Sequence, residues 1–268
     1  MSKTIKEYIE RYVSEGLTLA QARNLTAQLI ILSKIEKSTF VDKVLLKGGV
    51  VMYNMTREKR RTTTDLDFDF LRYDISSDDS IRMFVETLDK KNSQYRVKID
   101  SKIEALRQQD YHGKRVKLLI YDSTESIRFK LDIGVHTLLA INQEKMCFSF
   151  EEGNNIFLMV NPPEQIFAEK LFSLSKIGPG TVRFKDVDDM YYLISNKSVD
   201  PKIVRLCLDL LTVNPINDIK DSQDAVDKAI DCLDNPFFTK NYMELGKSWM
   251  NADYIKMKKT IVDYLLRI

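Results

Sequence analysis

The sequence predicts an α/β protein with two N-terminal helices, a core built on a mixed β-sheet, and a helical C-terminal domain. Three observations support this prediction: helical apolar spacing at the N-terminus, short apolar and alternating runs in the middle, and helical patterns after Pro163. The 268 residues are enough for one large domain or two ordinary ones. Asn161-Pro162-Pro163 interrupts any regular element, so we expect domains at 1–161 and 162–268.

Residues 3–36 are expected to form two helices. Ile5, Tyr8, Ile9 and Tyr12 fall at the spacing of a helical apolar stripe. Thr18 is a suitable N-cap for the second helix. This second helix is apolar on most sides, and we therefore expect it to be buried.

Strands are expected through the middle of the chain. A short apolar run ends at Gly48-Gly49, a helical stretch follows at 50–55, and the segment 65–70 alternates strictly between aspartate and apolar residues. The other elements expected here are a helix at 78–92, strands at 95–103, 114–122, 127–135 and 156–160, and a turn at 123–126 that makes a hairpin of the strands beside it. The expected C-terminal helices span 164–176, 184–195, 200–211, 222–233, 239–249 and 252–267.

The composition is that of a soluble globular protein with little net charge. Apolar residues make up 44% and charged residues 30%, and 41 Lys and Arg nearly cancel 39 Asp and Glu. This excludes a strongly basic protein but leaves room for a local basic groove. Three scattered cysteines and two histidines, His112 and His136, argue against a disulfide framework or a zinc site. Without a secretory signal or a stretch of about 20 apolar residues, we expect a cytoplasmic protein outside the membrane.

Asp65-Leu66-Asp67 is the first candidate for chemistry. Residues i and i+2 of a strand face the same side, so both carboxylates would point together. Two adjacent carboxylates repel each other, and Mg²⁺ resolves the conflict because it prefers carboxylate oxygens and leaves room for substrate phosphates. A solvated edge strand with alternating acids is the alternative, and it is the more common meaning of this pattern on its own.

Two other segments favour the metal site. Gly48-Gly49 lies between an apolar run and a helix, where small residues let backbone N–H groups approach a phosphate, although a glycine pair more often marks a simple turn. Asp132 has an apolar residue on each side within the expected strand 127–135. It is either an exposed position of that strand or the third acid of a two-metal phosphoryl-transfer site.

Four segments resemble, in order, the motifs of one enzyme family. Gly48-Gly49 and then Arg61-Thr62-Thr63-Thr64-Asp65-Leu66-Asp67 are similar to the first motif of polymerase-beta-type nucleotidyltransferases, and above all to the abortive-infection toxin branch (AbiEii/AbiGii type). Asp132 resembles the third carboxylate of that superfamily. The segment 163–171 resembles the P-E-x-x-x-A-E-K-L helix of the toxin branch, and 183–191 resembles its R-x-K-D-x-x-D-[LM]-Y segment.

The resemblance implies a role for each matching residue. Gly48 and Gly49 would bind the incoming triphosphate together with Thr63, which occupies the [ST] position. Asp65, Asp67 and Asp132 would bind Mg²⁺, with two ions expected, and Asp132 would help to activate the acceptor hydroxyl. Lys170 would contact the nucleotide phosphates, and Asp186 would orient Lys170 or the base. The wider superfamily often has Gly-Ser where this chain has Gly-Gly, so phosphate contacts would rest on backbone N–H groups.

Each C-terminal residue also has a simpler interpretation. Glu169 and Lys170 could be ordinary helix surface, and Asp186, Asp188 and Asp189 could complement the dipole of a helix that starts nearby. The basic stretch 57–61 could bind an acceptor or form a solvated loop. His112 and His136 are expected to be structural.

By resemblance, the protein would transfer a nucleoside monophosphate from an NTP to RNA, with tRNA 3′ ends as the leading acceptor. It would act as the toxin of a bacterial toxin–antitoxin or phage-defence pair, with a cognate antitoxin as its partner. A nucleotidyltransferase with a small-molecule or protein acceptor and a binding protein without activity are the alternatives. The sequence does not identify the nucleotide, the acceptor, the oligomeric state or the way an antitoxin acts.

Overall fold

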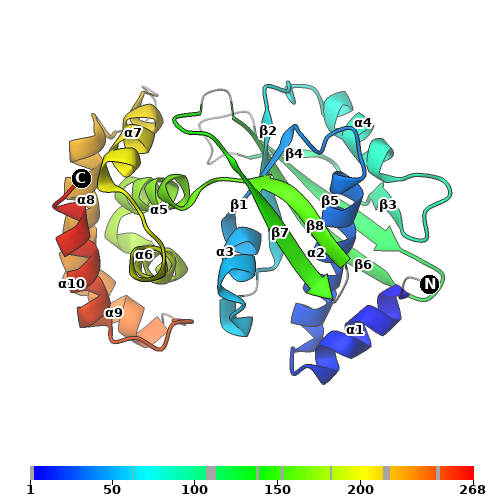
Figure 1. Ribbon diagram of the computed structural model, residues 1–268, viewed down its shortest axis with the longest axis horizontal. Coiled ribbons are helices and arrows are strands. Elements are labelled where there is room, and N and C mark those ends of the chain that lie inside the picture. Colours follow the sequence, from blue (N-terminus) through cyan, green and yellow to red (C-terminus); the bar gives the residue numbers. More distant parts are fainter. Residues whose placement is uncertain are drawn as a thin grey trace. The chain divides into compact units, whose positions relative to one another are not determined.

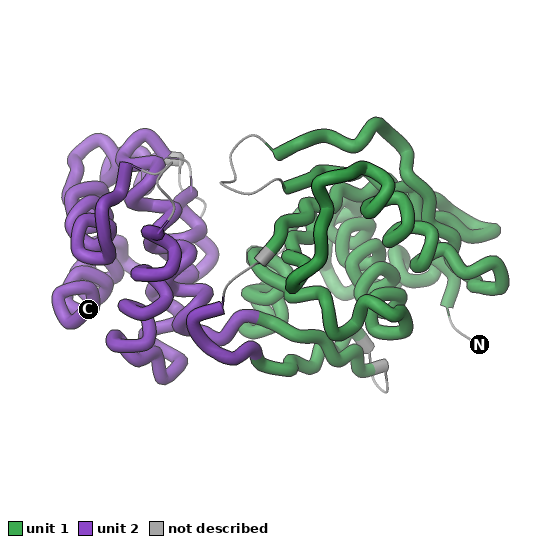
Figure 2. Tube along the Cα trace, turned by 90° about the horizontal axis from the view of Figure 1, so that it is seen from above, with its two compact units in different colours: residues 1–137, 144–160 green, residues 138–143, 161–268 purple. Residues whose placement is uncertain are grey.

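The computed structural model describes residues 3–61, 63–106, 113–136, 139–151, 154–181, 183–213, 218–245 and 248–268 (Figure 1). The chain divides into two compact units: residues 1–137 with 144–160, and residues 138–143 with 161–268 (Figure 2). That 1–161 and 162–268 are separate domains stays a prediction. None of the described helices is long and apolar enough to cross a membrane.

The first unit is built on one mixed sheet of eight strands in the order β3-β5-β6-β2-β1-β8-β7, with β4 paired to β5. The pairs β2–β6 and β1–β8 are parallel, and the other pairs are antiparallel. The strands are β1 Val44–Lys47, β2 Asp65–Leu71, β3 Arg96–Ile99, β4 Glu104–Ala105, β5 Lys114–Tyr121, β6 Ser126–His136, β7 Glu144–Glu151 and β8 Asn154–Val160. The helical elements of this unit are α1 Ile5–Ser14, α2 Leu19–Glu36, α3 Gly48–Thr56, η1 Lys59–Arg61 and α4 Asp78–Leu88.

The alternation of β2 decides which way its aspartates point. Phe68 and Phe70 are fully buried and pack against Phe84 of α4 and Phe40. Because successive strand residues face opposite sides, this packing turns the aspartates of β2 toward the other face of the sheet. The core on one face therefore fixes the direction of the carboxylates on the other.

The predicted N-terminal helices are confirmed. Thr18 caps α2 in a capping box, in which its hydroxyl accepts from the Gln21 N–H and the Gln21 side chain accepts from the Thr18 N–H. As expected, α2 is largely buried, and it lies against β6 and β8. The predicted hairpin is also present, as β5 and β6 in antiparallel pairing.

Four element predictions need correction. The strand β7 was not predicted, because it is an edge strand in which Phe148 is the one buried residue among those whose burial is described, 144–150. The predicted strand 95–103 forms only β3 and, further on, β4. The helix predicted to reach residue 92 ends at Leu88, because the Asp89 carboxylate accepts hydrogen bonds from Arg96 and from the Val97 N–H at the start of β3.

The second unit consists of helices: α5 Pro163–Ile177, η2 Gly178–Gly180, α6 Phe184–Asn196, α7 Pro201–Thr212, α8 Ser222–Asp234, α9 Pro236–Leu245 and α10 Tyr254–Leu265. In it, α5 packs against α6, α7 and α8. The helix predicted at 239–249 runs instead over Pro236–Leu245, and the Trp249 N–H donates to the Asp188 carboxylate rather than to a helix carbonyl. This is the fourth correction.

Candidate active site

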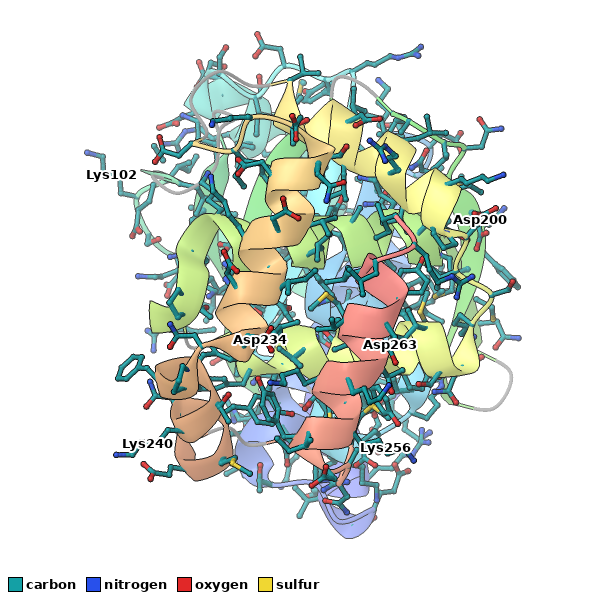
Figure 3. The ribbon with its side chains drawn as sticks, turned by 90° about the vertical axis from the view of Figure 1, so that its left-hand side faces the viewer. Lys102, Asp200, Asp234, Lys240, Lys256 and Asp263 are labelled. Atoms are coloured by element: carbon teal, nitrogen blue, oxygen red, sulfur yellow. The ribbon has the colours of Figure 1, made fainter. Side chains whose placement is uncertain are left out.

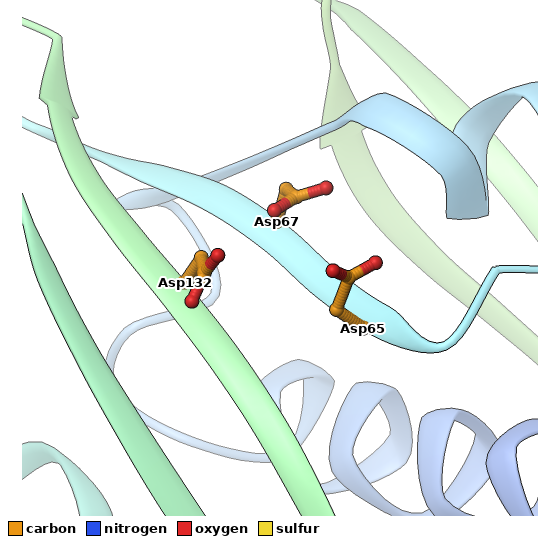
Figure 4. Close-up of side chains that lie close together, drawn as sticks. All are labelled: Asp65, Asp67 and Asp132. Atoms are coloured by element: carbon orange, nitrogen blue, oxygen red, sulfur yellow. The ribbon is translucent and has the colours of Figure 1, made fainter. Parts of the chain in front are cut away.

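Three carboxylates meet on the face of the sheet opposite the aromatic core. The parallel pairing of β2 and β6 sets Asp67 directly beside Asp132, and Asp65 is two residues before Asp67 on the same side of β2. One oxygen of each carboxylate lies within 4.8 Å of one oxygen of each of the others, and Figure 4 shows the three side chains converging. The structure therefore brings together the three predicted metal ligands.

Two of these carboxylates are held by cations. Arg115 of β5 lies opposite Asp132 and donates from Nε and Nη2 to its two oxygens, both at 2.7 Å. Asp65 accepts from the Thr63 hydroxyl on Oδ1 at 2.7 Å and pairs through Oδ2 with Lys130 Nζ, also at 2.7 Å. Each of the two carboxylates therefore has a hydrogen-bond donor or a cation at both of its oxygens.

Asp67 differs from both neighbours. Among the described residues, no donor makes a hydrogen bond to its carboxylate, although the side chain is partly buried. Burial and the charge of Asp65 raise its pKa to about 7, and Asp132 adds to this against the opposing effect of Lys47. Lys47 lies across from Asp67 in the pairing of β1 and β2, but its ammonium binds Asp69 at 2.6 Å. Asp67 is thus the carboxylate of the three that has no direct hydrogen bond or ion pair among the described residues.

The glycine pair is required by this arrangement. Gly48 has φ +68°, and a Cβ at this position would lie 2.6 Å from Asp67 Oδ2. A Cβ on Gly49 would lie 2.5 Å from the Cβ of Thr63. The pair opens α3, and the Lys47 side chain makes no capping hydrogen bond to the first turn. The N-terminus of α3 therefore lies beside the carboxylates without a side-chain cap. Its free backbone N–H groups and the helix dipole favour the binding of an anion there.

Lys170 and Asp186 lie together in the second unit. The Lys170 ammonium is 2.8 Å from Asp186 and 2.6 Å from Asp189, and only 8% of the residue is exposed. The interpretation of Lys170 as ordinary helix surface is therefore wrong. Asp186 does contact Lys170, as its predicted orienting role requires.

Asp189 and Asp188 extend this cluster. The Asp189 carboxylate also accepts from the Trp249 indole at 3.1 Å, and Asp188 accepts from the Tyr242 hydroxyl, from Ser248 and from the Trp249 N–H. From the sequence, both aspartates were expected only to complement the dipole of the helix. The signal for Asp189 was its position three residues after Asp186, which places both side chains on one face of α6.

The basic stretch 57–61 is engaged within its own unit. Arg57 donates to the Ser149 carbonyl, Lys59 to the Glu15 carbonyl, and Arg60 pairs with Glu58. Arg61 is buried. The stretch therefore makes contacts within its own unit, while Arg57, Lys59 and Arg60 remain exposed to solvent.

Three lysines, Lys256, Lys258 and Lys259, lie on α10. Lys258 pairs with Asp234 of α8 at 2.9 Å, and Lys259 pairs with Asp263 at 2.6 Å. Figure 3 shows Lys256 and Asp263 along α10 and Asp234 on α8. Acidic partners thus offset two of these three lysines. His112 lies outside the described residues, and His136 is the last residue of β6.

Lys130 and Arg115 were missed from the sequence. The same alternation that put Asp132 on the site face also puts Lys130 there, two residues earlier in β6. Arg115 could be found only from the register of the hairpin, because a shift by one residue would turn its side chain to the other face.

A mixed sheet that carries paired carboxylates beside a glycine-led helix defines a nucleotidyltransferase. The sequence matches the family described as "Nucleotidyl transferase AbiEii toxin, Type IV TA system" over residues 30–247. The chain belongs to this family of nucleotidyltransferase toxins from type IV toxin–antitoxin systems. The resemblance found in the sequence is thereby confirmed.

Solved structures show the same fold. MenT4, the nucleotidyltransferase toxin Rv2826c from Mycobacterium tuberculosis H37Rv, superposes with a TM-score of 0.59 at 15% identity, over 99% of each chain. JHP933 from Helicobacter pylori gives a TM-score of 0.50 at 14% identity, over 93% of this chain and 92% of its own. No curated protein sequence matches the chain.

Proposed function

We propose that this nucleotidyltransferase uses Mg²⁺ to transfer a nucleoside monophosphate from an NTP to RNA, with a tRNA 3′ end as the leading acceptor. The observation that carries the proposal is the meeting of Asp65, Asp67 and Asp132 beside the glycine-led start of α3. Carboxylates bind the metal that a triphosphate needs, and an uncapped helix N-terminus binds phosphate. The RNA acceptor itself is inferred from the family to which the chain belongs.

The carboxylates fit a divalent cation. Asp67 is partly buried without a hydrogen-bond donor among the described residues, and burial and the charge of Asp65 raise its pKa to about 7, so a bound cation would stabilise its charged form. Asp65, Asp67 and Asp132 would hold the metal, and the family resemblance implies two ions. When bound, Mg²⁺ would neutralise the triphosphate and the leaving pyrophosphate.

The residues of the chain would position the two substrates. The N–H groups at Gly48 and Gly49 would bind the phosphates, because a glycine lets an anion come close to the backbone. Thr63 would hold Asp65 in place through the hydrogen bond to Oδ1. The roles implied for Lys170 and Asp186 stay predictions.

The reaction would be an in-line displacement. The acceptor hydroxyl oxygen would attack the α-phosphorus, and a new O–P bond would form as the bond to the bridging oxygen breaks and pyrophosphate leaves with the electron pair. Asp132, held by the Arg115 fork, would accept the hydroxyl proton. In this class of reaction, positioning and charge stabilisation provide most of the rate enhancement.

The family implies a cognate antitoxin. We propose that transfer to RNA arrests growth, and that the antitoxin relieves this arrest in a phage-defence pair. These statements rest on family membership and not on a surface of this chain.

The test uses purified protein, total RNA, Mg²⁺ and each α-³²P-labelled NTP in turn. Wild type should label a small RNA with one of the four nucleotides. Asp67→Asn should reduce the labelling of RNA by more than about 100-fold. Changes to residues that only contact a metal ligand already cost about 10- to 100-fold, and Asp67 is proposed as a ligand itself. Asp79→Asn is the matched control, because Asp79 lies on α4 outside the site, and it should keep wild-type labelling.

Two outcomes would count against the proposal. Equal labelling by Asp67→Asn would remove this carboxylate from the site. No labelled RNA with any nucleotide would exclude RNA as the acceptor, and the same assay with small-molecule and protein acceptors would then identify the class.

A further inference from the structure

The three cations nearest the carboxylates are bound in different ways. Arg115 grips both oxygens of Asp132 in a planar two-bond fork, and Lys47 is committed to Asp69, whose side chain is almost completely buried. Lys130 binds Asp65 through one ammonium contact of 2.7 Å, and 34% of its side chain is exposed. A lysine is a point charge on a flexible stem, whereas the arginine fork is rigid. Lys130 is therefore the cation of the three that can leave most easily.

Lys130 places a positive charge directly on Asp65. The Thr63 hydroxyl already takes Oδ1 of Asp65, and Lys130 takes Oδ2. An ion shared by Asp65 and Asp67 would bring a double positive charge next to the Lys130 ammonium. At an effective dielectric constant of about 20, unit charges about 4 Å apart interact strongly, so the two cations cannot share this carboxylate without a large repulsion.

We propose that Lys130 is the resident counter-cation of Asp65 in the metal-free protein, and that a divalent ion must displace it in order to bind. This rests on the proposed function, in which Asp65 and Asp67 hold the metal. The competition weakens binding of the metal alone. Because the nucleotide phosphates supply further oxygen ligands, the site takes its ion mainly together with the triphosphate. Lys130 also limits repulsion among the carboxylates while the metal is absent.

The test measures Mn²⁺ binding by electron paramagnetic resonance in the full chain without nucleotide, at low ionic strength. Lys130→Met should bind Mn²⁺ about 10-fold more tightly than wild type, because the competing charge is gone. Lys130→Gln should behave like Lys130→Met, whereas Lys130→Arg should stay close to wild type. This series separates the charge from the hydrogen bond. The difference should shrink as salt screens the partly exposed ammonium.

Arg128→Met is the matched control. Arg128 lies two residues before Lys130 on β6. Its side chain is 79% exposed, and its guanidinium pairs with Asp100 at 2.7 Å. The substitution removes the same charge from the same face of the same strand without touching the three carboxylates. Its Mn²⁺ affinity should stay within about 2-fold of wild type, because an exposed charge outside the site is screened.

Thermal unfolding in EDTA gives a second measurement. Lys130→Met should unfold at a lower temperature than wild type without metal, and Mn²⁺ should raise its midpoint by more than it raises that of wild type. Circular dichroism shows whether each variant is folded, and Lys130→Gln serves if Lys130→Met is not.

Each alternative outcome has its own meaning. Mn²⁺ affinity that is unchanged or weaker in both Lys130→Met and Lys130→Gln would overturn the proposal, because Lys130 would then orient Asp65 and not compete with the ion. Equal Mn²⁺ binding by Asp67→Asn and wild type would refute the metal site of the proposed function itself. Loss of binding in Asp67→Asn, together with tighter binding in Lys130→Met, supports both.

Discussion

A Cβ atom added to Gly48 would lie 2.6 Å from Oδ2 of Asp67. The glycine is therefore required twice, once for its positive φ of +68° and once because the carboxylate fills the space in which a side chain would stand. The start of α3 and the least compensated carboxylate of the site are thus fitted to each other.

Gly48→Ala should destabilise the protein by about 2–4 kcal/mol, because a left-handed conformation costs about 1–2 kcal/mol and the contact adds to it. It should also weaken Mn²⁺ binding by moving Asp67. Gly16→Ala is the control: Gly16 follows α1 with φ +91°, and the added Cβ would meet only Lys59 Nζ at 3.8 Å, an ordinary contact, so it carries the conformational cost without a clash. Calorimetric unfolding of both variants measures the difference. Equal costs at the two positions would show that the carboxylate moves aside freely.

Gly49→Ala should be rescued by a change at Thr63. All three nearest atoms to a Cβ at Gly49 belong to the Thr63 side chain, at 2.5 to 2.9 Å. We expect Gly49→Ala to cost about 1–3 kcal/mol, and Thr63→Gly to recover part of this loss in the double variant. A double-mutant cycle of unfolding free energies gives the coupling. If the changes in unfolding free energy of the two single variants simply add in the double variant, the Thr63 side chain is not the source of the strain.

Asp67→Asn should stabilise the metal-free protein while removing its activity. Its folded-state pKa of about 7 lies above the ordinary value of 3.8, so the charge of Asp67 costs stability progressively as pH rises from about 4 to about 7. Above this window we expect Asp67→Asn to be more stable than wild type by about 2 kcal/mol in EDTA, and the gain to be smaller at pH 5.

Urea unfolding of the two proteins at pH 8 and pH 5 measures this gain. Asp69→Asn is the control on the same strand, and it should destabilise, because Asp69 is buried and paired with Lys47 at 2.6 Å. A stabilising Asp69→Asn, or an Asp67→Asn that is less stable at pH 8, would contradict this account of the charges.

The sequence predicted the elements that carry the site because their signals are local. Alternation in β2 identified the strand and the side on which Asp65 and Asp67 lie, and the glycine pair marked the start of α3. The counter-charges were not predicted, since Arg115 and Lys130 reach the carboxylates only through the register of β5, β6 and β2. A register depends on packing across the whole sheet, so it cannot be predicted from the sequence of one strand.

The predicted ends of two helices were wrong for a related reason. The helix before β3 ends where Asp89 binds Arg96, and the segment after α9 is drawn to Asp188, so contacts distant in sequence override the helical pattern. Edge strands such as β7 carry too little buried surface to show a clear alternation.

Lys170→Met should destabilise the second unit by about 3–5 kcal/mol. The substitution leaves Asp186 and the fully buried Asp189 without the ammonium that lies 2.8 and 2.6 Å from them, and an unpaired buried charge is costly. The single tryptophan of the chain, Trp249, is 4% exposed and donates to Asp189, so its fluorescence reports on this cluster. Urea unfolding followed by Trp249 emission measures the effect.

Lys176→Met is the matched control, because Lys176 is exposed in the last turn of the same helix, and it should change stability by less than about 0.5 kcal/mol. Adding Asp189→Asn to Lys170→Met should restore part of the lost stability, since asparagine removes the charge and can still accept from the indole. If Lys170→Met unfolds at the same urea concentration as Lys176→Met, the ion pairs do not stabilise this unit. Activity lost in Lys170→Met would then have a cause other than unfolding.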